Sequence, residues 1–344
     1  MRIMPIAVGV VLLPVWVVVA TIPLPAAVWP PPLSVSCSGG PGPAIDSKLK
    51  FVLTGAGASS DITTGATARY LPLLTQHTAH GSGINTIAIN VGGDSMLGQA
   101  TDYSYSITAD GTDTVNVTAK SPFGVAYALE TFSQFITPEH GTVACNALQV
   151  TDSPAFVHRG VMIDTGRRFY PVALVKQTID GLAMTKQNIL HFHLSEECFR
   201  VQSKAYPQLT QTPCVVGSNN NTAFYTHEDV ADIVSYARAR GVRVVPEFDM
   251  PGHSGGFCKA LATAGLKCCG NQIEDDPEGV SVKIISTVLT EMAGLFPDEI
   301  LNIGCDETGS RAPCTTENTK SLTLTLTPTL TLTLTLTLAL TPDP

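Results

Sequence analysis

From residue 156 onward, short hydrophobic runs alternate with longer segments whose hydrophobic residues recur at helical spacing. Short runs predict buried strands, and the wider spacing predicts amphipathic helices. Strands are predicted at Gly160–Ile163, Asn188–Leu194, Val242–Phe248 and Ile300–Gly304, and helices at Val172–Lys186 and Val280–Leu295. Another helix begins after Thr226, with Asp229 in the capping-box position, and ends at Gly241. Repeated strand–helix units favour a parallel sheet, either open or closed into an eight-stranded barrel.

The preceding region, 45–152, has a different pattern. Asn85–Val91 reads as a strand, and Tyr103–Ile107 with Asp113–Ala119 reads as a hairpin around Asp110-Gly111. Phe123–Ile136 carries hydrophobic residues at helical spacing. These elements predict a small α+β domain without evident chemistry of its own.

Both ends of the chain differ from the rest. Residues 1–27 have a basic start, a hydrophobic run and small residues near its end, which predicts a secretory signal, with an uncleaved membrane anchor as the alternative. The Pro-rich stretch 28–44 reads as a linker. Residues 311–344 are mostly Leu-Thr alternation, which we interpret as translation through a simple nucleotide repeat outside the native fold. As a real peptide, this tail would be prone to aggregation.

Charge and cysteine content narrow the class of protein. A net charge of −9 and the lack of a Lys/Arg cluster argue against nucleic-acid binding. Nine cysteines suit an oxidising compartment, and their odd number leaves at least one unpaired. Asn116 and Asn220 begin glycosylation patterns. We therefore expect the secretory pathway, with the medium, the cell surface and a lysosome-like compartment all open.

The ends of the four predicted strands of region 156–307 are polar. Arg159 precedes the first strand. In chain order, the first strand end carries Asp164, Arg167 and Arg168, and the second carries His191, His193, Glu196 and Glu197. The third carries Glu247, Asp249 and His253, and the fourth carries Asp306 and Glu307. Reactive groups of βα barrels collect at these carboxyl ends. Each group alone has an ordinary explanation, such as an ion pair for Arg159, a core position for one of the two histidines, or a helix start at 306–307. Four polar strand ends in succession exceed what packing requires.

Four ordered motifs resemble the β-N-acetylhexosaminidases, family 20 of the glycoside hydrolases. They are His158-Arg-Gly-Val-Met-Ile-Asp-Thr-Gly-Arg-Arg-Phe169, Lys186-Gln-Asn-Ile-Leu-His-Phe-His-Leu-Ser195, Gly241-Val-Arg-Val-Val-Pro-Glu-Phe-Asp-Met-Pro-Gly-His253 and Leu301-Asn-Ile-Gly-Cys-Asp-Glu307. The segment Tyr103–Ile136 is similar to the accessory domain that precedes the barrel in this family. The resemblance implies an accessory α+β domain at 45–152 and the first half of a (β/α)8 TIM-barrel catalytic domain at 153–310.

The resemblance also implies a retaining, substrate-assisted mechanism that removes terminal β-linked N-acetylglucosamine or N-acetylgalactosamine. The general acid maps onto Glu307, and the acid that holds the 2-acetamido group maps onto Asp306. Arg159 matches the arginine that binds the outer sugar hydroxyls. His253, with Glu196, matches the network that supports the acid. The implied partners are an oligosaccharide or glycoconjugate substrate and a second copy in a homodimer, with a membrane only if the amino-terminal segment stays uncleaved.

The chain departs from the family pattern in two places. Ser195-Glu-Glu-Cys-Phe199 has glutamates where the family has two aspartates. After Glu307 the family has four more strands, which supply pocket tryptophans, and neither Trp16 nor Trp29 is placed to replace them. We expect an incomplete version of an active enzyme. The alternatives are an inactive carbohydrate-binding relative and a fragment that does not fold.

A metal-dependent hydrolase on a similar barrel is a further alternative, because His191-Phe-His193 at a strand end can bind a divalent ion. Such a site needs more histidines and an aspartate on later strands, and only His253 is available. We therefore expect no metal and no organic cofactor.

Overall fold

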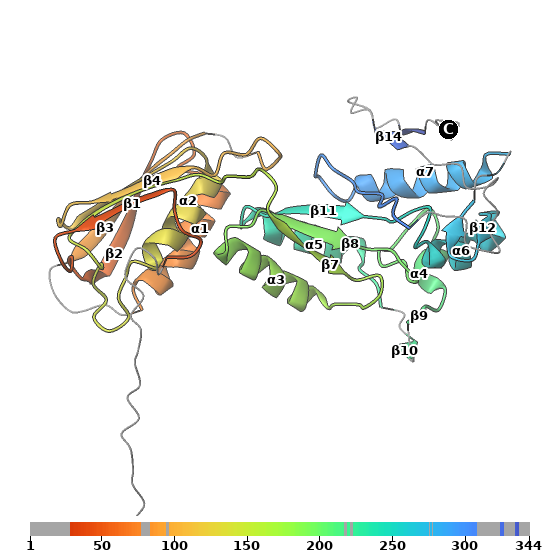
Figure 1. Cartoon of the computed structure of the whole chain (residues 1–344), viewed down its shortest axis with the longest axis horizontal. Coiled ribbons are helices and arrows are strands. Elements are labelled where there is room, and N and C mark those ends of the chain that lie inside the picture. Colours follow the sequence, from red (N-terminus) through yellow and green to blue (C-terminus); the bar gives the residue numbers. More distant parts are fainter. Residues whose placement is uncertain are drawn as a thin grey trace, which may run out of the picture.

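The structure is a computed structural model of the 344-residue chain. It describes residues 28–76, 83–93, 96–216, 219–220, 223–274, 276, 278–307, 324–326 and 334–336. Figure 1 shows two units side by side, the first built from residues up to about 152 and the second from the residues that follow. The predicted signal or anchor at 1–27 lies outside the described residues. No helix within them is long and apolar enough to cross a membrane.

The first unit is a six-stranded mixed sheet with two helices. Its spatial order is β1-β6-β4-β5-β3-β2. The strands are β1 (Ser34–Ser38), β2 (Ile45–Thr54), β3 (Ile84–Val91), β4 (Tyr105–Ala109), β5 (Thr114–Ala119) and β6 (Ala147–Asp152). Helices α1 (Asp61–Leu74) and α2 (Pro122–Ser133) pack together, and their buried side chains join those of the strands in one core. The predicted strand, hairpin and helix are all present, with bounds shifted by up to three residues.

The stretch 28–44 is not a linker, so this expectation is wrong. Strand β1 pairs antiparallel with β6 along its whole length, and Cys37 forms a disulfide with Cys145. Val28 is 1% exposed and joins the core of the first unit. The prolines obscured a short strand in which half-buried Val35 and Cys37 alternate with exposed serines.

The second unit is built on three parallel strands in the order β11-β8-β7. They are β7 (Gly160–Asp164), β8 (Ile189–His193) and β11 (Arg243–Glu247), and the main helices are α3 (Val172–Met184), α5 (His227–Arg238), α6 (Gly255–Leu261) and α7 (Val280–Ala293). The short elements are α4 (Gln208–Gln211), β9 (Val215–Val216), β10 (Asn219–Asn220), η1 (Ala262–Ala264), β12 (Cys268–Cys269), β13 (Gln272–Ile273), β14 (Leu324–Leu326) and β15 (Leu334–Leu336).

Helix α5 begins as its sequence predicts. The Thr226 hydroxyl accepts from the Asp229 amide at 3.0 Å, and the Asp229 carboxylate accepts from the Thr226 amide at 2.9 Å. Both contacts of the predicted capping box are therefore formed. Of the Leu-Thr tail, the described parts are β14 and β15, which pair antiparallel, and its interpretation as a repeat product stays a prediction.

The predicted fourth strand, Ile300–Gly304, does not form a regular strand. It runs parallel to β11 through one bridge between Glu247 and Asn302, where the Asn302 amide donates to the Pro246 carbonyl at 2.9 Å. Its backbone then turns out of the strand conformation at Gly304, with φ of +67°. The segment keeps the order expected of a fourth barrel strand without the full ladder.

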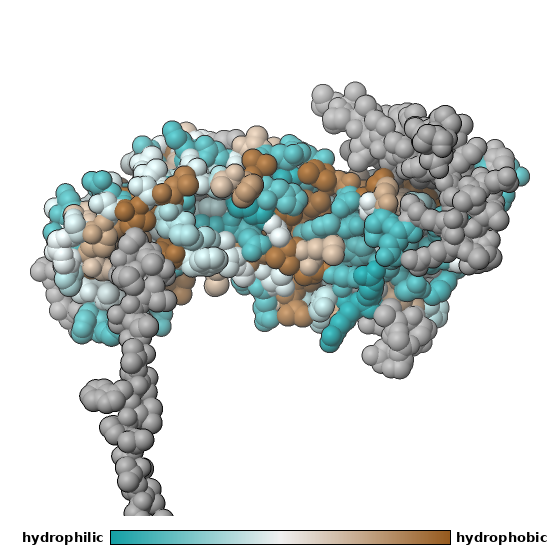
Figure 2. Space-filling view, viewed as in Figure 1, coloured by the Kyte–Doolittle hydropathy of each residue, from teal (hydrophilic) through white to brown (hydrophobic). Residues whose placement is uncertain are grey.

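The parallel sheet stays open within the described residues, with β7 at one edge. Val161 and Met162 of β7 are 44% and 52% exposed, whereas every residue of β11 is buried. Figure 2 shows hydrophobic residues at the surface in the region where Figure 1 places β7 and α3. The part of the barrel that is described therefore leaves an apolar edge in contact with solvent.

A buried ion pair connects the two units. Lys186, which follows α3, donates to the Asp152 carboxylate at 2.9 Å and to the Tyr105 hydroxyl at 2.8 Å. The two charged side chains are 8% and 13% exposed. A second pair between the units, Arg238–Asp61 at 2.9 Å, is solvent-exposed.

The substitution Asp152→Asn should lower the free energy of unfolding by about 3 kcal/mol, because it leaves the Lys186 ammonium buried without its counter-charge. Urea denaturation measures this change. Asp61→Asn is the matched control, since it breaks the exposed pair between the same units and should cost less than about 1 kcal/mol. Equal losses in the two variants would show that burial does not determine how much an ion pair between the units stabilises the fold.

Candidate active site

The register of the three parallel strands brings their carboxyl ends to one level. Asp164 pairs in register with His193, and His193 pairs with Glu247. Side chains alternate along a strand, so His191 and His193 of β8 lie on one face and Phe192 on the other. Phe192 is fully buried and packs in the core with the helices. The acidic and basic groups predicted at the first three strand ends therefore meet on one side of the sheet.

His253 is the centre of this group and connects it to the predicted catalytic pair. Its Nδ1 lies 3.1 Å from a Glu196 carboxylate oxygen. Its Nε2 lies 3.3 Å from the Glu307 carboxylate and 3.6 Å from that of Asp306. Three of the other four predicted site residues are thus gathered around the His253 ring. Glu196 is buried, while the Asp306 and Glu307 side chains are 64% and 57% exposed.

Arg159 is the predicted site residue that the structure does not bring to the site. It precedes β7, at the opposite end of the strand from Asp164. Its Nε donates to the Lys186 carbonyl and its Nη2 to the Tyr127 hydroxyl, each at 3.0 Å. The guanidinium also lies 5.3 Å from the ring centre of Tyr103. Among the described residues, the Arg159 side chain is used at the junction with the first unit, and its binding of sugar hydroxyls, which the family resemblance implies, stays a prediction.

Arg167 is the arginine at the site. Its guanidinium contacts Glu196 at 2.5 Å and Asp164 at 2.9 Å, and it approaches His253 Nδ1 to 3.5 Å. The side chain is 56% exposed, so it presents charge to solvent beside Glu196. It could have been found from the sequence, because it follows the carboxyl end of a strand whereas Arg159 precedes the amino end.

Glu247 is held between two histidines. Its Oε2 contacts His191 Nε2 and lies 3.2 Å from His193 Nδ1. Burial tends to raise the pKa of the Glu247 carboxyl, but the adjacent His191 and His193 rings lower it to about 2. We therefore expect Glu247 to be ionised at neutral pH.

Asp249 supports the turn that carries the catalytic pair. It is 1% exposed, and its Oδ1 accepts from the Cys305 amide at 3.2 Å. Burial and the neighbouring Asp306 carboxylate raise the pKa of Asp249 to about 7. A Cβ added at Gly304 would lie 1.8 Å from Asp249 Oδ1, so only glycine allows this close approach.

Backbone strain gathers at the same place. The described residues include four non-glycine residues with positive φ: Lys186, His253, Cys305 and Glu307. The last three lie at the site, with φ of 49°, 75° and 49°. Such conformations cost of order 1–3 kcal/mol each and persist where surrounding contacts enforce them. Strained residues of this kind gather at functional sites, and here they fall at the predicted catalytic pair and beside it.

Three sets of residues have ligand atoms close enough to hold a metal ion. They are Asp164, His193 and Glu196; Glu196, Asp249 and His253; and Glu247, Asp249 and Asp306. In the first two sets Glu196 is already paired with the Arg167 guanidinium at 2.5 Å. A fixed cation beside a carboxylate opposes a second cation there. These contacts favour ion pairs between the side chains over a bound metal ion. The expected absence of a metal stays a prediction.

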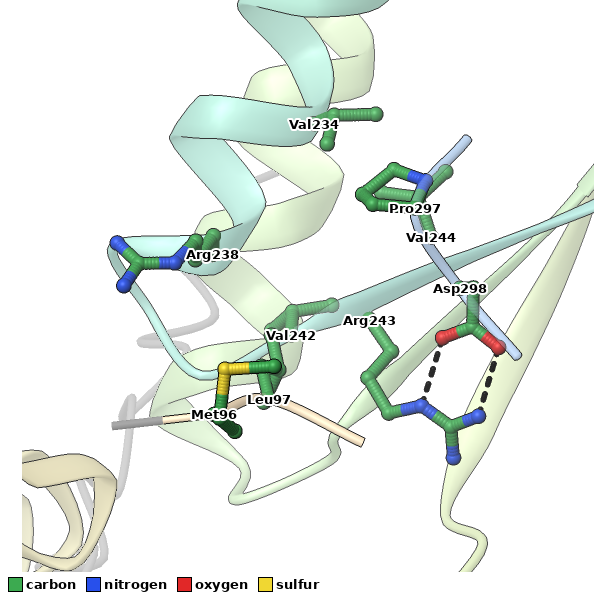
Figure 3. A pocket seen from close by; sticks show the side chains of 9 residues that line it. All are labelled: Met96, Leu97, Val234, Arg238, Val242, Arg243, Val244, Pro297 and Asp298. Atoms are coloured by element: carbon green, nitrogen blue, oxygen red, sulfur yellow. Dashed lines mark hydrogen bonds and ion pairs between the residues drawn. The ribbon is translucent and has the colours of Figure 1, made fainter. Parts of the chain in front are cut away.

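A cavity of about 200 Å³ lies elsewhere, at the amino ends of the strands. Figure 3 shows its lining, in which Arg243 and Asp298 form a two-fold ion pair with each other. The remaining lining is mainly apolar and includes Met96 and Leu97 of the first unit. The amino-terminal face of a βα barrel usually serves stability, so we do not assign chemistry to this cavity.

The substitution Gly304→Ala should lower the free energy of unfolding by at least about 2 kcal/mol more than Gly279→Ala does. Both glycines have φ near +68° (+67° and +69°), and a left-handed alanine costs about 1–2 kcal/mol at either. An added Cβ meets no described atom within 4 Å at Gly279, whereas at Gly304 it displaces Asp249. Chemical denaturation measures both costs, and equal values would contradict the close contact.

Comparison with known proteins places the second unit in a family. The profile of "Glycosyl hydrolase family 20, catalytic domain" matches residues 156–324. The β subunit of mouse (Mus musculus) β-hexosaminidase is 34% identical over 223 residues, which cover 62% of this chain and 41% of that relative. A β-hexosaminidase of Emericella nidulans is 29% identical over 235 residues, covering 62% of this chain and 38% of the relative.

Solved structures agree with the sequence matches. A chitobiase of Flavobacterium johnsoniae superposes with a TM-score of 0.70 at 28% identity, covering 82% of this chain and 45% of the other. An exo-β-N-acetylglucosaminidase of Vibrio harveyi, in complex with N-acetylglucosamine, gives 0.68 at 26% identity, covering 84% and 48%. The chain thus spans less than half the length of each of these proteins. Its second unit, with its parallel strands and the site at their carboxyl ends, belongs to glycosyl hydrolase family 20.

Proposed function

We propose that this protein is a β-N-acetylhexosaminidase, which removes terminal β-linked N-acetylglucosamine or N-acetylgalactosamine from oligosaccharides or glycoconjugates. The observation that carries the proposal is the placement of His253 between Glu196 on one side and the Asp306–Glu307 pair on the other. Family membership and the names of the relatives support the same substrate class.

Glu307 is proposed as the general acid that protonates the glycosidic oxygen. Its carboxylate lies 3.3 Å from His253 Nε2, so the imidazole ring can exchange a proton with Glu307. Asp306 is proposed to hold the substrate's 2-acetamido group while the carbonyl oxygen of that group attacks the anomeric carbon. The neutral amide then becomes a cationic oxazoline, and the Asp306 carboxylate stabilises that charge. Water opens the ring, with Glu307 acting as base.

Arg167 is proposed to bind sugar hydroxyls at the site, in addition to Arg159, whose contacts among the described residues lie beside the first unit. The Arg167 guanidinium is half exposed and is oriented by Asp164 and Glu196. A guanidinium held by two carboxylates keeps a fixed direction for its remaining donors.

A second candidate is carbohydrate binding without turnover. The catalytic pair is more than half exposed, and the tryptophan described, Trp29, lies in the first unit and is 68% exposed. The described residues therefore bound the site mainly on the side of His253. Such a surface can bind a sugar through Arg167 and still leave the acetamido group without an enclosing wall.

The compartment proposed is the secretory pathway, outside the cell or in a lysosome-like organelle. Cys37–Cys145, Cys198–Cys214 and Cys258–Cys268 are disulfide-bonded, which suits oxidising conditions. Cys305 is an exposed free thiol. Asn116 is exposed on β5 and stays a predicted glycan acceptor, and a homodimer stays a proposal.

Glu307→Gln should reduce kcat/KM for the disaccharide of β-linked N-acetylglucosamine at least ~100-fold, because general acid catalysis contributes about 10²–10⁴ when the leaving group is poor. Asp306→Asn should lose about 10²–10³-fold through weaker stabilisation of the oxazoline. Release of free N-acetylglucosamine measures both rates.

Glu299→Gln is the control, since this carboxylate lies near Gly98 and the first unit and should leave the rate unchanged. The corresponding glucoside, without a 2-acetamido group, should not be cleaved. Turnover of that glucoside would contradict substrate assistance. Sugar binding by the wild type without any turnover would favour the second candidate.

A further inference from the structure

His193 has a carboxylate beside each of its two ring nitrogens. Nδ1 lies 3.2 Å from Glu247 and Nε2 lies 3.4 Å from Glu196. The residue is 5% exposed, so bulk solvent does little to screen these charges from one another. A ligand atom of Asp164, the last residue of β7, also lies within 4.8 Å of those of His193 and Glu196. His193 therefore faces acidic groups from β7, from β11 and from the loop after β8.

The protonation state follows from this geometry. A neutral imidazole has one N–H donor and one nitrogen lone pair, and an ionised carboxylate can only accept. In the neutral form one ring nitrogen would direct its lone pair at a carboxylate, which is repulsive. The imidazolium presents a donor on both sides. Among the described residues neither nitrogen has a hydrogen bond of good geometry, so the attraction is chiefly between charges.

We propose that His193 is a permanent imidazolium that joins Glu247 to Glu196 and thereby fixes the carboxylate that orients His253. This assignment rests on the proposed function and makes His193 a positioning residue for it, since the ring touches neither Asp306 nor Glu307. The resulting chain of contacts runs from Glu247 through His193 and Glu196 to His253, which contacts the catalytic pair.

The backbone holds the ring in place. The Thr165 amide and hydroxyl donate to the His193 carbonyl at 3.0 and 2.8 Å, and the Leu194 amide donates to the Glu247 carbonyl at 2.9 Å. Glu196 is held from its other side by Arg167 at 2.5 Å. Neither carboxylate can leave His193 without breaking a further contact, because Glu247 also contacts His191.

The expected titration agrees with a permanent charge. Burial tends to lower the pKa of His193, but Glu196 and Glu247 outweigh it and raise the pKa to about 10. A histidine with a raised folded-state pKa stabilises the fold fully below its unfolded value of about 6.5 and loses this effect as pH rises through 10. We therefore expect His193 to stay charged from pH 6 to pH 9, a range over which a histidine with a pKa near 6.5 loses its proton.

The test is ¹⁵N NMR of the histidine rings in the whole chain between pH 6 and pH 9. His193, assigned through its loss in His193→Gln, should keep both nitrogens protonated throughout. A neutral His193 at pH 8 would overturn the proposal. His193→Gln should also shift the ring resonances of His253, because Glu196 loses its charged partner. Unchanged His253 resonances would equally overturn the proposal.

His227→Gln is the matched control, because His227 is also largely buried and lies 3.6 Å from a carboxylate, that of Glu291. It should leave the His253 resonances unchanged. In the hydrolysis assay His193→Gln should lower kcat at least tenfold with little change in KM, and wild-type kcat in this variant would exclude the positioning role. If the wild type cleaves no N-acetylhexosaminide, the proposed function fails while the NMR experiment still decides the charge of His193.

Discussion

Strands β7, β8 and β11 lie parallel and in register, so that Asp164, His193 and Glu247 reach the same edge of the sheet together. Every other polar contact of the site depends on this register, because a slip of one residue would turn His191 and His193 to the face that packs against the helices. The register is fixed by hydrophobic side chains of the strands, chiefly Leu190, Phe192 and Val244, which are buried. Packing of the core thus determines where the charges are placed.

The site then has to keep several acids close together in a partly buried space. Glu247 and Glu196 are each buried and each has a cationic or histidine partner on two sides. An isolated buried carboxylate favours its protonated form, and a neighbouring cation opposes this. At Asp249, burial and the neighbouring Asp306 carboxylate instead raise the pKa to about 7. The order of acids and bases across the strands therefore sets which carboxyls carry charge.

The first unit contributes to the second through its junction. Lys186 and Arg159, both at the amino-terminal end of the parallel strands, make their polar contacts with Asp152, Tyr105 and Tyr127 of the first unit. The amino-terminal end of the sheet therefore binds the second unit to the first, and the carboxyl end carries the predicted reactive groups. The same separation explains why two arginines, both near β7 in the sequence, have different uses.

The sequence alone predicted β7, β8 and β11, helices α3, α5 and α7, the capping box of α5 and the polar residues at the strand ends, because local periodicity and side-chain chemistry depend on near neighbours. It also indicated the family through motifs at Asp164, His193, His253 and Glu307. The tertiary structure decided what depends on contacts between distant residues. It placed Arg167 rather than Arg159 at the site, since the two ends of a five-residue strand lie far apart. It drew residues 34–38 into the sheet through pairing with β6, and it put His193 between two glutamates from separate segments. The charge of that histidine follows from its surroundings, and those exist only once the strands have packed.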